Sequence, residues 1–303
     1  MRAFKIIALV LLLGFLFCVG GMTYLMSPKD SSSSAKQDVE IQLGNSRTDI
    51  AKKLYEAGII RSEFALFAYM KLTKANAIPG IYEFSPSMSG SVIAEKLANG
   101  EYKTVKATII EGWRAKDIET YLVDDKGLTQ MNGFAEKAES YEGYLFPDTY
   151  ELPVNVTIEE VIKLLRDNFD KRTSGLDVGP DAVILASIVE REAASDSERS
   201  DIAGVYANRL KSGMKLEADP TIQYAKGNWK SVTLEEYHSV ISPYNTYLNE
   251  GLPPGPICNP GLASIRSALS PTGHNYYFFF HAQGNIYLST TYEQHRAKVA
   301  QYF

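Results

Sequence analysis

Residues 184–194 read Ile184-Leu185-Ala186-Ser187-Ile188-Val189-Glu190-Arg191-Glu192-Ala193-Ala194, and they form the most informative segment of the chain. On a helix that advances about 100° per residue, the apolar side chains of this segment share one stripe with Glu192 near its centre. Glu190 points to the opposite side. A carboxyl group held against apolar side chains loses hydration, which raises its pKa and favours its protonated form.

The helix is expected to end at this point, because Ser195-Asp196-Ser197-Glu198 has the pattern of a capping box that opens the next helix. The negative end of the first helix then raises the pKa of Glu192 further. A carboxylic acid that stays protonated near neutral pH is the proton donor that cleavage of a glycosidic bond requires. The alternative is that Glu192 extends to water or pairs with Arg191 or Arg199.

Composition sets broad limits on the protein. The 303 residues are 45% hydrophobic and 22% charged, which predicts an ordinary folded protein with two domains beyond its N-terminus. The net charge of −5 argues against a nucleic-acid partner. The four histidines share no metal-ligand spacing, so neither a metal site nor a cofactor is expected. The sequence holds no Gly-x-Ser-x-Gly elbow and no phosphate-binding glycine loop.

The N-terminus has the pattern of a membrane anchor. Residues 6–26 carry no charge and span roughly 30 Å as a helix, enough to cross a bilayer. Arg2 and Lys5 predict that residues 1–5 lie in the cytoplasm and the rest of the chain outside. The apolar run is long for a signal peptide, so an uncleaved anchor is favoured over cleavage after Gly20. Residues 27–38, with Ser31–Ser34, are predicted to be a flexible tether.

Two α+β domains are predicted beyond the tether. In residues 39–130, a strand over 39–43, two helices and a strand over 80–84 form a β-α-α-β unit, and a helix and a strand follow. Residues 131–303 are predicted to hold helices over 158–169, around Glu192 and over 197–210, and a hairpin of strands 276–280 and 286–289. Between the last helix and the hairpin, Pro and Gly indicate extended, ordered loops, where binding groups concentrate.

The carboxyl groups narrow the possible chemistry. Hydrolysis of a glycosidic bond normally takes two carboxylates. Besides Glu192, the candidates are Asp148, Asp219 and Glu190, and the two aspartates stand beside prolines, where a turn-capping role is favoured. One carboxyl group suffices if the substrate supplies its own nucleophile. Cys258 is predicted to be a buried spectator.

Six segments together resemble the endolytic murein transglycosylase family, the YceG-like proteins. They are Glu142-Gly143-Tyr144-Leu145-Phe146-Pro147-Asp148-Thr149-Tyr150, Ala186-Ser187-Ile188-Val189-Glu190-Arg191-Glu192, Asp219-Pro220-Thr221-Ile222-Gln223-Tyr224, Tyr244-Asn245-Thr246-Tyr247, Gly251-Leu252-Pro253-Pro254-Gly255-Pro256-Ile257 and Asn259-Pro260-Gly261. They stand in the family's order, and the resemblance extends over nearly the whole chain. It implies that residues 39–130 form a LysM-like domain and that 131–303 are catalytic, with a segment before Glu142 that is shorter than in many relatives.

The resemblance implies an enzyme that cleaves the β-1,4 bond between N-acetylmuramic acid and N-acetylglucosamine within nascent peptidoglycan strands and so terminates their elongation. The second Glu of the Val-Glu-x-Glu stretch is catalytic in that family, which assigns the role to Glu192, with Glu190 in reserve. Glu192 would protonate the departing oxygen and then accept the proton of the muramyl C6 hydroxyl. The product is a 1,6-anhydromuramyl end, so the reaction is that of a lyase and consumes no water.

The resemblance also suggests supporting residues and partners. The substrate-binding candidates are Tyr244, Asn245, Thr246, Tyr247, Thr221, Gln223 and Asp148, with loop packing as the alternative for each. The implied partners are peptidoglycan strands and the peptidoglycan synthases (penicillin-binding proteins) of the cytoplasmic membrane, which the N-terminal helix spans once, with the catalytic domain outside. Two rival functions are a membrane-tethered peptidoglycan-binding scaffold without catalysis and a glycoside hydrolase that leaves reducing ends.

Overall fold

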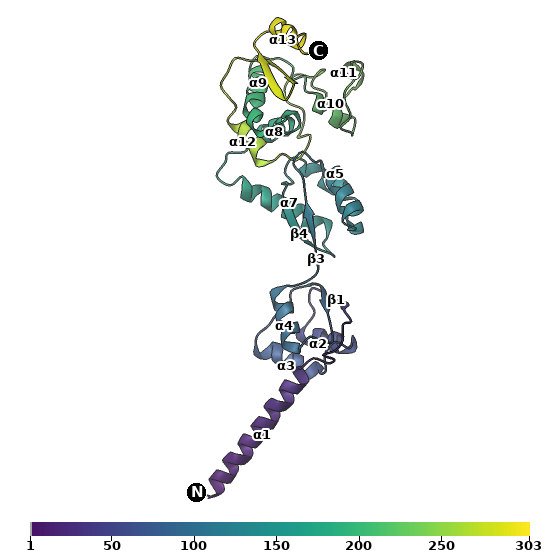
Figure 1. The fold of residues 1–303 in the computed structure, drawn as a ribbon, viewed down its shortest axis with the longest axis vertical. Coiled ribbons are helices and arrows are strands. Elements are labelled where there is room, and N and C mark those ends of the chain that lie inside the picture. The colour runs from purple at the N-terminus through teal and green to yellow at the C-terminus, as the bar shows by residue number, and fades with distance from the viewer. Residues whose placement is uncertain (1) are drawn as a thin grey trace. The chain divides into compact units, whose positions relative to one another are not determined.

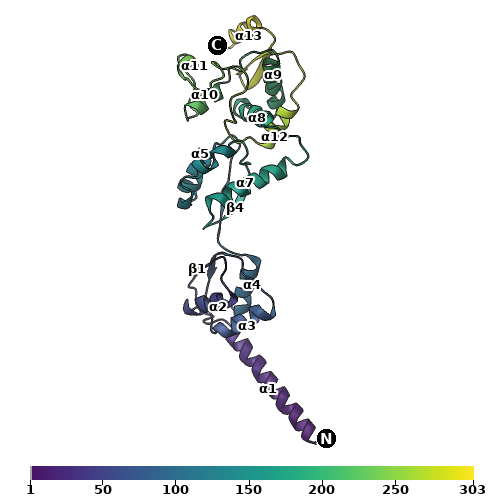
Figure 2. The same ribbon diagram turned by 180° about the vertical axis from the view of Figure 1, so that it is seen from behind.

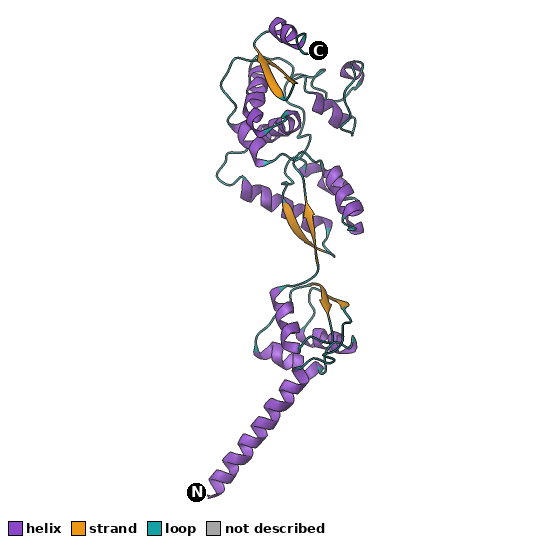
Figure 3. Cartoon of the chain, viewed as in Figure 1, coloured by secondary structure: helices purple, strands orange, loops and turns teal. Residues whose placement is uncertain are grey.

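The chain folds into two compact units. The computed structural model describes residues 2–303, with side chains from Phe4 onward. One unit comprises Met1–Val105 with Glu151–Asn155, and the other comprises Lys106–Tyr150 with Val156–Phe303. Helices and short two-stranded sheets make up both units, which confirms the predicted α+β class (Figure 3).

The division between the units does not fall at residue 130. The chain passes from one unit to the other within the paired strands β3 (Thr104–Thr108) and β4 (Thr149–Pro153). Residues 106–130 therefore pack with the second unit. Gly127 and Gly133, on either side of residue 130, lie in turns between short helices of that unit.

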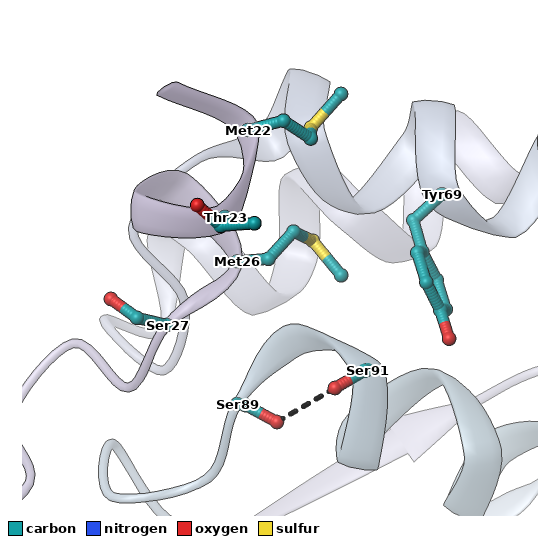
Figure 4. A pocket seen from close by; sticks show the side chains of 7 residues that line it. All are labelled: Met22, Thr23, Met26, Ser27, Tyr69, Ser89 and Ser91. Atoms are coloured by element: carbon teal, nitrogen blue, oxygen red, sulfur yellow. Dashed lines mark hydrogen bonds between the residues drawn. The ribbon is translucent and has the colours of Figure 1, made fainter. Parts of the chain in front are cut away.

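The first unit begins with the long apolar helix α1 (Arg2–Met26) (Figures 1 and 2). Residues Phe4–Met26 are long and apolar enough to cross a membrane, and most of their large side chains are exposed. The last turn of α1 contacts the folded part of the unit at a pocket between Met26, Tyr69 and Ser89 (Figure 4). A Cβ on Gly90 would lie 2.8 Å from Met26 Sδ, so the missing side chain leaves room for this methionine.

The predicted β-α-α-β order is present in the first unit. Its elements are β1 (Gln37–Ile41), α2 (Arg47–Glu56), α3 (Glu63–Leu72) and β2 (Gly80–Phe84), followed by α4 (Gly90–Asn99). The strands β1 and β2 are antiparallel, with Val39 opposite Tyr82. Ser46 caps α2 in a capping box with Asp49. The strands and helices enclose a core that includes Leu54, Leu66, Met70, Tyr82, Phe84, Ile93 and Leu97.

The segment expected to be a free tether lies along the first unit instead. Asp30 N donates to Pro86 O at 3.0 Å, and Arg61 Nε donates to Pro28 O at 2.9 Å. The strand β1 then begins at Gln37. The serine run itself bonds locally, with Ser32 N and Ser33 N donating to Asp30, while the residues before it are held by partners distant in sequence.

The second unit is mainly helical. Its core contains α8 (Pro180–Glu192), which packs against α9 (Arg199–Lys211) and α12 (Leu262–Leu269), as Figures 1 and 2 show from both sides. The other elements are α5 (Ala115–Thr120), a π-helix at Tyr121–Asp125, 3-10 turns at Thr129–Met131, Glu139–Tyr141 and Asp196–Glu198, α6 (Phe134–Ala138), α7 (Ile158–Arg172), α10 (Asp219–Ala225), α11 (Glu236–Ser239), β5 (Phe278–Ala282), β6 (Asn285–Ser289) and α13 (Tyr292–Val299).

The hairpin of β5 and β6 was predicted within two residues, and Phe280 stands opposite Tyr287 in it. The Pro- and Gly-rich region, by contrast, is not free of regular structure. Residues 219–225 form the helix α10, with Pro220 in its first turn, where a missing N–H costs nothing.

Candidate active site

Glu192 is the last residue of α8. Pro180 opens this helix, and its middle, Val183–Val189, is buried. The backbone leaves helical geometry at Ala193, with φ −70° and ψ 129°. The carbonyl groups that end the helix therefore lie next to the glutamate and disfavour its negative charge.

The predicted capping box after α8 does not form. Ser195 makes no side-chain cap, and the carboxylate of Glu198 accepts from Ala194 N at 3.1 Å. The same carboxylate lies 3.0 Å from His281 Nε2. Glu198 thus joins the turn that follows Glu192 to the strand β5, because its oxygens have partners from both segments.

The carboxyl group of Glu192 is enclosed by protein, although the residue as a whole keeps some exposure. Burial raises its pKa to about 7, and the negative charge of Asp219 acts in the same direction. The hydroxyl of Tyr206 donates to Glu192 Oε1 at 2.9 Å, and this hydrogen bond and the charge of Arg209 oppose the rise. The balance leaves an acid that exchanges its proton near neutral pH.

Glu192 faces a cavity of about 230 Å³. Helices α8, α9 and α10, the segment before α10 and the strand β5 supply its lining, which is Glu192, Tyr206, Arg209, Leu216, Glu217, Asp219, Phe279, Phe280 and His281. Arg209 ties these segments together: Nε donates to Tyr277 O at 2.7 Å and Nη1 to Leu216 O at 2.7 Å.

Besides Glu192, the cavity holds two carboxylates, Glu217, which pairs with Arg209, and Asp219. Asp219 stands in the first turn of α10, and the hydroxyl of Tyr247 donates to its Oδ1 at 2.7 Å. The rings of Tyr237 and Tyr247 stack 4.2 Å apart, and burial together with Asp219 raises the pKa of Tyr247. Sequence analysis favoured a turn-capping role for Asp219, but its partner is the tyrosine side chain.

Two of the substrate-binding candidates, Thr221 and Thr246, are buried and hold the loop in front of Asp219. Their hydroxyl groups are 3.0 Å apart, Thr246 Oγ1 accepts from Ala218 N and Thr221 Oγ1 donates to Ala218 O. These bonds correspond to the loop-packing alternative for both threonines.

Asn245 likewise makes internal bonds. Its amide nitrogen donates to Val240 O at 2.9 Å, and its oxygen accepts from Tyr247 N at 2.9 Å. Gln223 donates to Lys230 O, and the ring of Tyr244 lies 4.8 Å from that of Tyr224. None of these three lines the cavity of Glu192.

Glu190 and Asp148 have other partners. Glu190 accepts from Arg199 Nη1 and from Gly261 N, both at 2.9 Å, and its side chain is only 5% exposed. Since Arg199 pairs with Glu190, it does not neutralise Glu192. Asp148 pairs with Arg172 and Asn168 beside a different pocket.

Sequence reasoning missed the buried carboxyl group of Glu142, the first residue of the 142–150 segment. It accepts from Ala115 N and from Asn259 Nδ2, and burial raises its pKa to about 7. It also overlooked Tyr206, Arg209 and His281. No local signal in the sequence connects any of these residues with Glu192.

Among the described residues, no cluster of three or more His, Cys, Asp or Glu side chains has the arrangement of a metal site. Cys258 is fully buried with Sγ 3.3 Å from Ser187 O, and burial raises the pKa of its thiol. Its predicted burial is confirmed.

A buried carboxylic acid with a raised pKa, close to a second carboxylate, is typical of enzymes that cleave glycosidic bonds by acid catalysis. Residues 39–301 match the model of the YceG-like family. The chain belongs to this family.

Its relatives include enzymes that are named for this kind of chemistry. An endolytic murein transglycosylase of Bacillus subtilis is 30% identical, and the match covers 92% of this chain and 88% of the relative. One of Streptococcus pneumoniae is 28% identical over 91% of this chain, which spans 60% of that longer protein. A 2.6 Å crystal structure of a YceG-like protein from Listeria monocytogenes is 31% identical, with a TM-score of 0.56 over 88% of this chain and 99% of that one.

Proposed function

We propose that this chain is a membrane-anchored lytic transglycosylase that cleaves the β-1,4 bond between N-acetylmuramic acid and N-acetylglucosamine inside peptidoglycan strands. One observation carries the proposal: Glu192 has a pKa of about 7 and lines a cavity that includes Asp219. Membership of the YceG-like family and the names of the relatives support the choice of substrate.

In the proposed reaction, Glu192 gives its proton to the glycosidic oxygen as the bond from that oxygen to muramyl C1 breaks. The C6 hydroxyl oxygen of the same sugar attacks C1, and the Glu192 carboxylate accepts the hydroxyl proton. The products are a free hydroxyl on the departing sugar and a 1,6-anhydromuramyl end. Glu192 returns to its starting state, and no water is consumed.

Two features of the site support these steps. Tyr206 holds one oxygen of Glu192, so the carboxyl group has a fixed orientation toward the cavity. Asp219 disfavours loss of the proton before the substrate binds, and its negative charge stabilises the positive charge that develops at C1.

The proposal extends to the location of the enzyme. Helix α1 anchors the chain in the cytoplasmic membrane with the catalytic unit outside, where nascent strands are assembled. The β-α-α-β region acts as a LysM-like binding domain, and peptidoglycan synthases of the same membrane supply the strands.

The proposal is tested with the Glu192→Gln variant of the full chain. The swap preserves size and removes the transferable proton, so we expect strand cleavage to fall by about a hundredfold to ten-thousandfold while the circular dichroism spectrum stays unchanged. Cleavage at the wild-type rate by a folded variant would contradict the role of Glu192.

A hydrolase is the second candidate function, because Asp219 supplies a second carboxylate in the same cavity. In a hydrolase, Asp219 activates water or attacks C1, and Asp219→Asn abolishes the reaction. In the transglycosylase, this variant keeps measurable cleavage and makes the same anhydro ends. The rate and products of the variant therefore separate the two functions.

A further inference from the structure

A second pocket of the unit that holds Glu192 (Lys106–Tyr150 with Val156–Phe303) lies along helix α7. It is formed by other residues than those that line the Glu192 cavity. Its volume is about 630 Å³, which is in the range of sites that hold small molecules or peptide segments. The two pockets share no lining residue. We call it the Arg166 pocket, and its lining is Lys137, Tyr141, Glu159, Ile162, Lys163 and Arg166.

Arg166 is held on tyrosine rings without a polar partner. Its guanidinium carbon lies 5.0 Å from the centre of the Tyr141 ring and 5.5 Å from that of Tyr144. Its Nε is buried, and no acceptor for it exists in the described part of the chain. The two terminal nitrogens of Arg166 make no hydrogen bond within residues 4–303 either, and they are not enclosed as Nε is, so they are the donors that can bind a ligand oxygen.

The charges around the pocket favour an anion. Lys137 pairs with Glu159, and Lys163 pairs with Asp167. Both lysines are thus neutralised by carboxylates, whereas Arg166 forms no ion pair within residues 4–303. A planar guanidinium fixed on aromatic rings is well suited to bind a carboxylate through two hydrogen bonds. Tyr141 and Ile162 add an apolar wall for the carbon atoms next to that carboxylate.

We propose that the Arg166 pocket binds a carboxylate of the stem peptide that peptidoglycan strands carry on their muramyl sugars. This inference rests on the proposed function, which supplies the strand as substrate. In peptide-bearing strands the lactyl carboxyl group of each muramyl sugar is taken up in an amide bond and the sugars are uncharged, so the peptide carboxylates are the groups that match Arg166. The pocket thereby favours strands that still carry peptides over strands from which the peptides have been removed.

The test uses the full chain in detergent with Glu192→Gln, which is expected to cut strands at least about a hundredfold more slowly, so that binding is measured before cleavage. Affinity is measured for strands with intact stem peptides and for the same strands after an amidase has removed the peptides and the lactyl carboxylates that it exposes have been capped as amides. We expect Arg166→Gln in this background to weaken binding to peptide-bearing strands about tenfold or more, the value of a charge-assisted hydrogen bond. Binding to peptide-free strands stays unchanged.

Two further variants make the result specific. Lys171→Gln removes the same charge from the same helix, but Lys171 lines the pocket of Asp148, so we expect no change in affinity. Arg166→Lys keeps the charge and loses the planar fork, and it recovers part of the affinity. This variant also serves as the test if Arg166→Gln does not fold.

Equal affinity of Arg166→Gln and its parent for peptide-bearing strands would overturn the inference, as would an equal loss on both kinds of strand. Cleavage by the chain with Glu192 intact is measured separately. If that chain cleaves and the Arg166 variants bind normally, the pocket assignment fails while the proposed function stands. If it does not cleave any strand, the proposed function fails.

Discussion

At the scale of single residues, the chemistry depends on a balance of forces at one carboxyl group. Burial and Asp219 raise the pKa of Glu192, while Tyr206 and Arg209 lower it, and the net result is about 7. Because the first step needs the protonated acid, the cleavage rate is expected to fall as the pH rises through this pKa. Substitution of Asp219 or of Tyr206 is therefore expected to shift the pH profile of cleavage in a definite direction.

Removal of the charge of Asp219 is expected to shift the profile toward lower pH. In Asp219→Asn, the negative charge that disfavours the ionised form of Glu192 is gone, so its pKa falls and the alkaline decline in rate begins earlier. Initial cleavage rates measured from pH 5 to about 9 would detect the shift. A decline at unchanged or higher pH would mean that Asp219 does not act on Glu192.

Removal of the Tyr206 hydroxyl is expected to shift the profile in the opposite direction. Tyr206→Phe deletes the hydrogen bond that stabilises the carboxylate, so the pKa of Glu192 rises and the decline in rate moves to higher pH. The same assay compares this variant with Asp219→Asn. Shifts of the two variants in the same direction would contradict the assigned electrostatics.

The periodicity of residues 184–194 placed Glu192 on the apolar face of its helix, because a helix fixes which side chains share a face. The family resemblance then assigned it the catalytic role, which stays a proposal. The partners of Glu192 could not be found in this way. Tyr206 comes from α9, Asp219 from α10 and His281 from β5, and only tertiary packing brings these elements to one cavity.

At the scale of elements, the turn before α10 depends on a pair of buried hydroxyl groups. Thr246 Oγ1 accepts a hydrogen bond from the buried Ala218 N and forms a second one with the hydroxyl of Thr221. We expect Thr246→Val to reduce the free energy of unfolding by about 1–3 kcal/mol, because the N–H loses its partner. Chemical denaturation measures the loss, and Thr149→Val, at an exposed position, serves as the control. Equal stability of the two variants would contradict the role of this pair.

Elements with local signals were predictable, and those without were not. Ser46 and Asp49 form a capping box at the start of α2, which is a signal that the sequence itself carries. In β2, every second residue is buried, as expected for a strand with one face on the core. Helix α10 lies in a Pro-rich region that predicted a loop, although proline is tolerated in a first turn. Ser195 and Glu198 match the capping pattern, yet Glu198 instead bonds to Ala194 N and His281.

At the scale of the whole molecule, the buried acids couple stability to pH. A glutamate carboxyl group ordinarily has a pKa of 4.5, whereas that of Glu192 in the folded chain is about 7. The protonated carboxyl group of Glu192 contributes fully to stability below its pKa in the unfolded chain. This contribution is lost as the pH rises through its pKa in the folded chain. Glu192→Gln does not titrate, so its stability relative to the wild type should increase between pH 5 and 8, by at most about 3 kcal/mol.

Thermal unfolding of both proteins at several pH values measures this difference. A constant difference across the range would show that Glu192 is not held in its neutral form.

The raised pKa of Glu192 follows from its burial at the end of α8, which the sequence predicted. The division of the chain at Val105 was not predictable, because it depends on the pairing of β3 with β4 across a long separation in sequence.

The central claim is tested most directly by mass spectrometry of the ends that the full chain produces from peptidoglycan strands, beside those from its Glu192→Gln form. The account predicts muramyl ends that are lighter by one water than reducing ends, made by the wild type and not by the variant. Reducing ends would contradict transglycosylation and establish hydrolysis. Strand binding without cleavage by either protein would indicate a tethered scaffold.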